Sequence, residues 1–439
     1  MIKHSIYSHQ FKRDNNFYLY NSETSFFIQI SERLYRLLYN REFDAIDSQT
    51  KEELLKHKFL VDEKDLYNYY NSTKMKFSAG CHNTKHLTLV LVPTTACNFS
   101  CPYCFEGEKK IIYMSEKVMT DIINFINGHE NVKTLSITWY GGEPLLAFSQ
   151  MEKLLKKIKD ETNVKITYQG IISNGYLLTE KMIEFFSINE FKLIQITLDG
   201  KKENHDKTRY LGSKHISTFD KIIANAEKAA NALPNCKISI RVNVKMQNVN
   251  DYIDLYTYFH NLKLNNIYVY PGFIREETVD GHRMCYDSLF NHKDRYLFYE
   301  QLSLNGVNVN FIPKHCSKGC MTSTINSYII GPEGEIYKCW NDVNHPEKVI
   351  GNISGKDITN QSLFYAYHEE TTVFVDDKCK DCMVFPICGG GCAWYRLKNL
   401  KEDKEFNVCS LYLDISVLEE CLLKNLEKRK SDLPILNIS

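Results

Sequence analysis

The chain has 439 residues, too many for one ordinary hydrophobic core, and this length predicts two or three domains. Hydrophobic residues make up 43%, and Lys plus Arg equals Asp plus Glu at 54 each, which indicates a soluble globular protein without the basic surplus of a nucleic-acid binder. No apolar run approaches the roughly 20 residues of a membrane helix and the first residues lack a signal-peptide core, so we expect a cytoplasmic protein.

Residues 1–85 predict a small α+β domain. NFYLYN (16–21) and SFFIQI (25–30) are typical of short strands, with a polar turn between them. ERLYRLL (32–38) and KEELLKH (51–57) predict short helices, and KFLVDE (58–63) predicts a third strand. We expect YNSTKMKFSAG (70–80) to be a linker.

Residues 86–305 predict a parallel sheet covered by helices, because β-rich apolar runs alternate with helical patterns. Ser115 and Thr179 are expected to cap two of the helices. In such sheets the active site forms at the carboxyl ends of the strands. The expected strands are LTLVLV (87–92), LSITWY (135–140), ITYQGII (166–172), LIQITLD (193–199), CKISIRVNV (236–244) and NIYVYPGF (266–273).

Three cysteines follow the first of these strands, Cys97, Cys101 and Cys104, in the spacing C-x3-C-x2-C. The chain has 15 cysteines, an odd count in a large chain, and this favours metal binding over disulfides. Zinc and iron–sulfur sites that are closed have four protein ligands, so three thiolates leave one position open for a substrate or cofactor. Taken alone, the spacing also fits a zinc knuckle or core thiols.

Short motifs close the next three strands in order. Each one alone marks a plain turn, but their succession at strand ends favours one shared site. The motifs are WYGGEP (139–144), SNG (173–175) and TLDG (197–200), the last followed by HDKTR (205–209). Arg241 on the fifth strand is either a further lining residue or an ordinary solvated arginine.

These motifs resemble those of the radical S-adenosylmethionine (SAM) enzymes. The resemblance implies a partial (β/α)6 TIM-like barrel in which Cys97, Cys101 and Cys104 hold a [4Fe-4S] cluster whose open iron binds SAM. It implies that an electron from the cluster cleaves SAM and yields a 5'-deoxyadenosyl radical. The residues that the resemblance assigns to SAM are Tyr103, Gly141, Gly142, Glu143, Ser173, Asn174, Thr197 and Arg209.

Residues 306–439 carry a second field of cysteines, which resembles the SPASM extension of this family. The resemblance implies two auxiliary [4Fe-4S] clusters, making three in all, and a C-terminal helix. The first cluster would take Cys316, Cys320, Cys339 and Cys392, and the second Cys379, Cys382, Cys388 and Cys409. Two zinc ribbons are the rival interpretation of this spacing.

The N-terminal domain resembles, faintly, the winged-helix-like precursor-recognition domain of enzymes that modify ribosomally made peptides. Such a domain captures a leader peptide as an added β-strand; a plain structural cap is the alternative. The resemblance implies a peptide maturase whose radical removes hydrogen from a precursor residue, which then closes a C–S or C–C crosslink. It also implies an electron donor such as flavodoxin or ferredoxin.

Two alternatives remain open. The chain could mature a protein subunit by a sulfatase-type or a quinone or thioether-type modification. In the sulfatase branch the residue after the cysteine matching Cys339 is an aspartate base, whereas here it is Trp340, with Asp342 out of register. The chain could also be a non-catalytic iron–sulfur carrier or scaffold. No general base can be assigned; Glu106, Asp342 and several tyrosines are all candidates.

Overall fold

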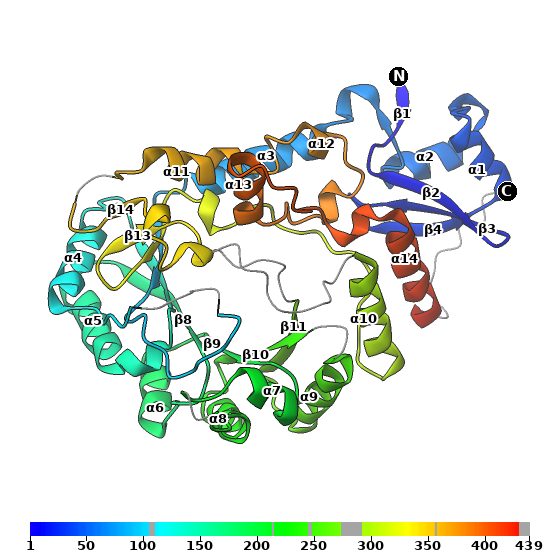
Figure 1. The fold of residues 1–439 in the computed structure, drawn as a ribbon. Coiled ribbons are helices and arrows are strands. Elements are labelled where there is room, and N and C mark those ends of the chain that lie inside the picture. Colours follow the sequence, from blue (N-terminus) through cyan, green and yellow to red (C-terminus); the bar gives the residue numbers. More distant parts are fainter. Residues whose placement is uncertain (105–109, 213–214, 245–247, 274–291, 356–357, 430–439) are drawn as a thin grey trace.

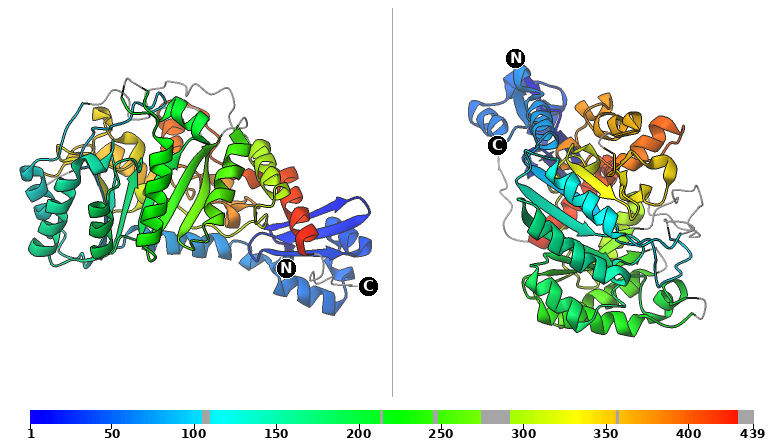
Figure 2. Two further views of the ribbon diagram at one scale, coloured as in Figure 1. Left: turned by 90° about the horizontal axis from the view of Figure 1, so that it is seen from below. Right: turned by 90° about the vertical axis from the view of Figure 1, so that its left-hand side faces the viewer.

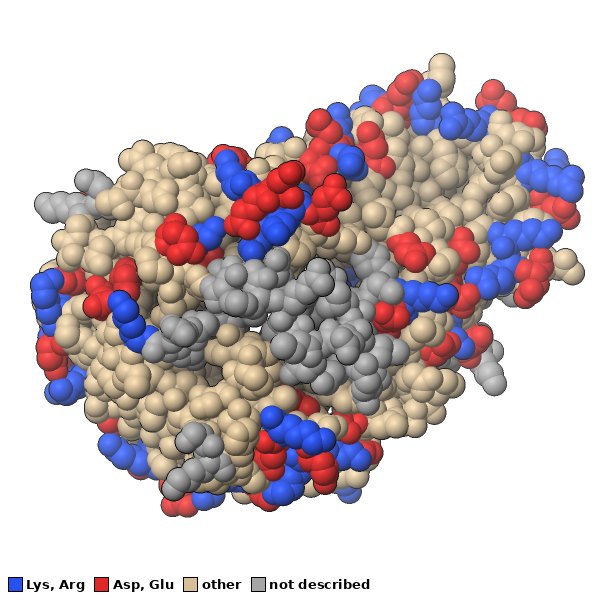
Figure 3. Space-filling view, viewed as in Figure 1, with Lys and Arg blue, Asp and Glu red and all other residues tan. Residues whose placement is uncertain are grey.

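A curved sheet with helices on its outer side forms the centre of the molecule, and a small N-terminal unit lies at one end (Figures 1 and 2). The structure is a computed structural model that describes residues 1–104, 110–212, 215–244, 248–273, 292–355 and 358–429. None of the described helices has both the length and the apolar character needed to cross a membrane. Acidic and basic side chains are intermixed on the face shown in Figure 3.

The N-terminal unit contains a three-stranded antiparallel sheet in the order β2-β3-β4 and a separate β1-β5 pair. The predicted strands and helices of this region are present, while β1 and β2 went unpredicted. Its core joins Leu19 and Ile28 of the sheet to Leu34, Leu38 and Leu54 of the helices. The elements are β1 (Ile2–His4), β2 (Ser8–Arg13), β3 (Asn16–Asn21), β4 (Phe26–Ile30), α1 (Glu32–Tyr39), α2 (Ser48–Lys56) and β5 (Leu60–Asp62).

The linker predicted over residues 70–80 is wrong, because this segment belongs to the helix α3 (Asn68–Cys81). The segment has no apolar stripe of helical period, which is why its sequence did not predict a helix. Tertiary packing stabilises it instead. The ring of Tyr70 lies 5.1 Å from that of Phe385, and the ring of Phe77 lies 5.0 Å from that of Phe374.

The six predicted parallel strands form one continuous sheet in the order β11-β10-β9-β8-β7-β6. Ser115 and Thr179 cap their helices as predicted, each accepting a backbone N–H with its side chain. The strands are β6 (His86–Leu91), β7 (Thr134–Trp139), β8 (Lys165–Ser173), β9 (Leu193–Leu198), β10 (Lys237–Val244) and β11 (Ile267–Phe273). The helices are α4 (Glu116–Asn127), α5 (Phe148–Glu161), α6 (Glu180–Ile188), α7 (Lys202–Thr208), α8 (Phe219–Ala232), α9 (Val249–Asn261) and α10 (His292–Leu304).

The sheet does not stop at β6, because β12 (Ser327–Ile330) from the C-terminal segment pairs with β6 in parallel. β13 (Glu335–Tyr337) and β14 (Gly351–Asn352) follow it antiparallel and complete a nine-stranded sheet. Buried residues pack across the junction, among them Val90 and Tyr140 on one side and Ile329 and Val343 on the other. The C-terminal segment thus contributes these three strands to the sheet of the barrel.

The rest of the C-terminal segment consists of short helices and irregular chain. A π-helix, η8, spans Ala366–Glu370. The last helix packs on the N-terminal sheet, with Leu418 and Leu422 in one core with Phe11 and Tyr20 (Figure 1). The helices are α11 (Gln361–Tyr365), α12 (Asp377–Lys380), α13 (Ala393–Lys401) and α14 (Ile415–Arg429).

Candidate active site

The three predicted cluster cysteines lie on the loop that follows β6, at the carboxyl end of the sheet. Cys97, Cys101 and Cys104 are each partly exposed. The loop is held from below by the chain after α7, since Ser100 donates its N–H to the carbonyl of Tyr210 at 3.2 Å. The neighbouring residues 105–109, including the candidate base Glu106, lie outside the described residues.

The two glycines after β7 let the cysteine loop pack directly on the next strand end. A Cβ atom on Gly142 would lie 2.3 Å from the carbonyl oxygen of Ala96 and 2.4 Å from that of Thr95. Gly141 has φ +119° and would likewise meet the oxygen of Thr94, at 2.5 Å. The backbone that these glycines approach is therefore that of the cysteine loop, and the loop position depends on them.

Glu143 joins the ends of β7 and β8. Its side chain is fully buried, and one carboxylate oxygen accepts the Ser173 hydroxyl at 2.8 Å while the other accepts the Asn174 N–H at 2.7 Å. Burial raises the pKa of Glu143, and the hydrogen bonds from Asn174 and Ser173 oppose that rise. The Asn174 side chain in turn donates to Asn98, inside the cysteine loop, at 2.7 Å.

A second network connects the cysteine loop to the end of β9. Arg209 is 9% exposed and donates to the hydroxyl of Tyr103 at 3.0 Å, and Tyr103 donates to Asp199. Burial disfavours the charge of Arg209, but Tyr103, Cys101 and Asp199 together raise its pKa. Cys101, one of the three predicted cluster ligands, therefore lies within electrostatic reach of this arginine, which carries a full positive charge.

Asp199 also accepts the Thr208 hydroxyl at 2.6 Å and the Asn243 amide at 2.9 Å, so its carboxylate is the centre of this network. The TLDG motif predicted no role for Asp199 itself. The position of Asp199 at a strand end was the signal that could have indicated one. Arg241 donates to Asn243 at 3.1 Å and pairs in register with Thr197, so both of these residues lie beside the network.

His205 is connected to the backbone of Arg209 through the hydroxyl of Thr218. The backbone N–H of Asp199 donates to Nδ1 of His205 at 3.3 Å, so the proton is on Nε2, which lies 3.0 Å from the Thr218 hydroxyl. That hydroxyl donates to the carbonyl of Arg209 at 2.6 Å. Burial lowers the pKa of His205 to about 4, so the ring is neutral near pH 7.

Two buried donors in these networks lack a hydrogen-bond partner among the described residues: Nε of Arg209 and the amide nitrogen of Asn98. A buried donor without a partner costs free energy, and a bound polar ligand relieves it. Both residues contact the cysteine loop, since Arg209 also lies 5.6 Å from the ring of Phe99. The donors fit a ligand with acceptor groups.

The C-terminal cysteines fall into groups by their mutual charges. Burial raises the pKa of Cys339 well above its ordinary value, and the thiolates of Cys392 and Cys320 raise it further. After burial, the charges of Cys388 and Cys409 raise the pKa of Cys382.

Cys379 joins the second of these groups, because the charge of Cys382 adds to burial and Asp376 in raising its pKa. Cys316 lies beside this group too, with its thiol 3.4 Å from the carbonyl of Ile387.

Lys318 is a residue that sequence analysis missed in this region. Its ammonium donates to the carbonyls of Phe385, Cys388 and Cys316. Burial lowers its pKa, whereas nearby thiolates, first those of Cys388 and Cys316, raise it. The signal in the sequence that could have indicated Lys318 was its place as the single lysine between Cys316 and Cys320.

Zinc sites and iron–sulfur clusters differ in how closely they bring the cysteine sulfurs together. In the described part of the chain, no three cysteine sulfurs lie within 4.8 Å of one another. A tetrahedral zinc ion with Zn–S bonds of about 2.3 Å holds its sulfurs roughly 3.8 Å apart. A four-iron cluster binds each thiolate through a separate iron and spaces them further apart.

Trp340 and Asp342, which follow Cys339, have different environments. The Trp340 ring is partly exposed and packs edge-on against Tyr140 at 4.8 Å, next to the glycines after β7. Asp342 is fully buried and accepts the Tyr367 hydroxyl at 2.7 Å, and burial raises its pKa to about 7. Since Asp342 faces the interior of the C-terminal segment, its geometry does not favour a role as the general base.

Comparisons with known proteins agree with this geometry. Residues 91–278 match the model of the radical SAM superfamily. A cysteine-type anaerobic sulfatase-maturating enzyme of Clostridium perfringens is 26% identical over 73% of this chain and 92% of its own length. The radical SAM cyclopropyl synthase TigE of Paramaledivibacter caminithermalis is 22% identical over 87% of each chain.

Two groups of solved structures share the fold. Native anSMEcpe with bound AdoMet and a Cys peptide has a TM-score of 0.60 at 24% identity, and covers 79% of this chain and 100% of its own. Streptococcus suis SuiB bound to its precursor peptide SuiA has a TM-score of 0.53 at 17% identity, and covers 94% of this chain and 99% of its own. The second likeness extends over more of this chain than the first.

Proposed function

We propose that this enzyme, whose residues 91–278 form a radical SAM domain, is a maturase that crosslinks a precursor peptide through a C–S or C–C bond. A radical SAM domain implies a [4Fe-4S] cluster and SAM. The observation that carries the proposal is the cysteine loop, held on three strand ends, in a chain whose N-terminal unit packs against its C-terminal helix.

Cys97, Cys101 and Cys104 would hold the cluster, and the networks around them would bind SAM. Glu143 fixes Ser173 and Asn174 at one strand end, and Arg209 with Tyr103 lies at another. The unpartnered donors of Arg209 and Asn98 support a ligand with acceptor groups. The further SAM contacts that we propose are Gly141, Gly142 and Thr197.

Cys97, Cys101 and Cys104 would hold the cluster that, with SAM, would supply a carbon radical able to remove a hydrogen atom from the substrate, and the C-terminal cysteines would hold clusters able to accept the electron released on crosslinking. Formation of a C–S bond would also release the thiol proton to water. The chain's part is to hold the reactants in place and to keep a fixed positive charge beside the cysteine loop, through Arg209.

Two auxiliary clusters in the C-terminal segment are the second part of the proposal. The grouping of Cys320, Cys339 and Cys392 and that of Cys379, Cys382, Cys388 and Cys409 support two separate sites. Cys316 completes the first set by the resemblance, although its thiol lies near the second set, beside the carbonyl of Ile387. The eight cysteines would supply four thiolates to each of the two clusters.

The N-terminal unit is the proposed leader-binding domain. Within the described residues, β2 and β4 each pair only with β3, so each has an unpaired edge that could accept a peptide strand. SuiB, which was solved with its precursor peptide, has a fold that extends over 94% of this chain. Sulfatase-maturating enzymes match less of it, 73% for one from C. perfringens.

Sulfatase-type oxidation of a cysteine or serine is the second candidate, favoured by several relatives with sulfatase-maturating names. Trp340 speaks against it, because a tryptophan packed on Tyr140 occupies the place of that branch's aspartate and has no basic group.

The test is anaerobic reconstitution with iron and sulfide, followed by SAM, a reductant and a peptide. We expect 5'-deoxyadenosine, and a peptide encoded beside the gene should lose two hydrogen atoms and resist cleavage across the new bond. Alanine at Cys97, Cys101 and Cys104 together should abolish the product but leave the auxiliary iron. Oxidation of a sulfatase-type cysteine peptide without a crosslink would favour the second candidate, and clusters without any 5'-deoxyadenosine would refute both.

A further inference from the structure

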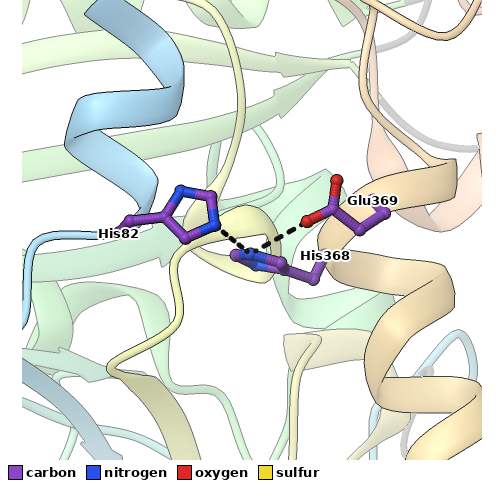
Figure 4. Close-up of side chains that lie close together, drawn as sticks. All are labelled: His82, His368 and Glu369. Atoms are coloured by element: carbon purple, nitrogen blue, oxygen red, sulfur yellow. Dashed lines mark hydrogen bonds and ion pairs between the residues drawn. The ribbon is translucent and has the colours of Figure 1, made fainter.

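Three metal-ligating side chains meet where α3 ends against the C-terminal segment (Figure 4). His82 is the C-cap residue directly after α3, and His368 and Glu369 are consecutive residues of the π-helix η8. Their ligand atoms all lie within 4.8 Å of one another, and no other such group occurs among the described residues. π-helices are rare and are often found at functional sites. The group is separate from all eleven cysteines assigned above.

The ring of His82 has the protonation that a metal ligand needs. Its Nδ1 lies 2.8 Å from the carbonyl oxygen of Ser78, which can only accept, so Nδ1 carries the proton. Nε2 is then the ring nitrogen that faces His368 and can supply a lone pair to a metal ion. A metal-bound histidine ordinarily donates its other ring N–H to a carbonyl or carboxylate in this way.

His368 is only 7% exposed and places Nε2 between the other two groups. This nitrogen lies 3.5 Å from Nε2 of His82 and 3.3 Å from a carboxylate oxygen of Glu369. Burial lowers the pKa of His368, and the neighbouring carboxylate of Glu369 opposes that change. Glu369 is 63% exposed and free to adjust its position.

The two distances match the edges of a metal coordination tetrahedron. With Zn–N and Zn–O bonds of about 2.0–2.1 Å, neighbouring ligand atoms are roughly 3.3–3.4 Å apart. Two uncharged imidazole nitrogens and one carboxylate oxygen are a ligand set that zinc accepts, with a fourth position for water. Direct contact of two Nε2 atoms at 3.5 Å is otherwise a poor hydrogen bond.

We propose that His82, His368 and Glu369 form a binding site for a divalent transition-metal ion, with zinc as the best fit. The ion joins residues 286 positions apart in the chain. It fixes the carboxyl end of α3, which connects the N-terminal unit to the barrel, onto the C-terminal segment. The site is a structural clamp and takes no part in the radical chemistry.

The test uses the anaerobic, cluster-loaded enzyme, so that the eleven cysteines assigned to clusters are not available to zinc. The protein is dialysed against micromolar Zn²⁺, and bound zinc and iron are counted by mass spectrometry. Wild type should bind one zinc ion more than the His82→Ala and Glu369→Gln variants, whose affinity should fall about tenfold or more. Both altered residues are exposed, so the variants should fold.

His57→Ala is the matched control. Nε2 of His57 lies 3.4 Å from a carboxylate oxygen of Glu53, a similar pair but without a third ligand. Zinc should also slow hydrogen exchange of the amides at 78–84 in wild type and in H57A, but not in H82A. Equal zinc binding by wild type and H82A, an equal loss in H57A, or unchanged exchange at 78–84 would overturn the clamp.

Discussion

Gly142→Ala is the sharpest test of the active-site geometry, because the added methyl would overlap backbone atoms of the cysteine loop. Its Cβ would lie 2.3 Å from the carbonyl oxygen of Ala96 and 2.6 Å from the carbonyl carbon, whereas real Cβ atoms essentially never approach closer than 3.0 Å. All the atoms it meets are backbone, which cannot rotate away. The loop that carries Cys97 must therefore move by roughly 0.7 Å.

Two effects of different size should follow from this shift. Overpacking of this kind costs about 1–3 kcal/mol of unfolding free energy. A displacement approaching 1 Å in a site that depends on position costs up to about 100-fold in rate. The formation of 5'-deoxyadenosine by G142A should therefore fall about 10–100-fold, although iron remains bound.

The assay is anaerobic 5'-deoxyadenosine formation with iron content and denaturant unfolding measured on the same samples. Gly80→Ala is the control, because Gly80 lies in α3 with nothing within 4 Å of its added Cβ. That change should leave the rate unaltered and stabilise α3 by about 0.5–1 kcal/mol. A wild-type rate in G142A would refute the close packing of the cysteine loop on the β7 end.

Three further predictions concern the supporting residues. His205→Gln should remove a pH dependence of stability. The ring of His205 has a pKa of about 4 in the folded protein and about 6.5 in the unfolded chain, so the unfolded chain binds the extra proton. The free energy of unfolding of the wild type, measured in urea, should therefore fall by about 2 kcal/mol from pH 7 to pH 5. Asp199→Asn places a donor opposite the hydroxyl of Tyr103 and should weaken SAM binding by about 1–3 kcal/mol, measured as a Kd; an unchanged Kd would contradict the network. Leu422→Ala opens a cavity in the core shared by α14 and the N-terminal sheet, and should cost about 2–4 kcal/mol and speed hydrogen exchange at residues 8–21; protection of that sheet in the variant would show that it folds without α14.

The sequence predicts the barrel strands well, because each is an apolar, β-branched run in a buried parallel sheet. It predicts the caps Ser115 and Thr179 for a local reason, since a cap depends on three or four residues. It does not predict β2, where only Phe11 is buried, or the pairing of β12 with β6. Pairing over some 240 residues leaves no local pattern to read.

The predicted site residues largely lie together at the strand ends, but the motifs do not predict the contacts that these residues make within the protein. Glu143 serves first to join two strand ends, and the glycines after β7 admit the cysteine loop. Asp199, the centre of the second network, gave only the weak signal of one aspartate in a turn. His82 and His368 are too far apart in the chain to form a recognisable spacing.

The junction of β6 with β12 bears on how this enzyme can be cut or recombined. A fragment ending at residue 305 would leave β6 as an open edge, with Val90 and Val92 uncovered, and such an edge promotes aggregation. The C-terminal segment acts as a wall of the barrel. A chimera that exchanges this segment must bring a strand whose register and inward residues match β6, or the cysteine loop above it will lose its support.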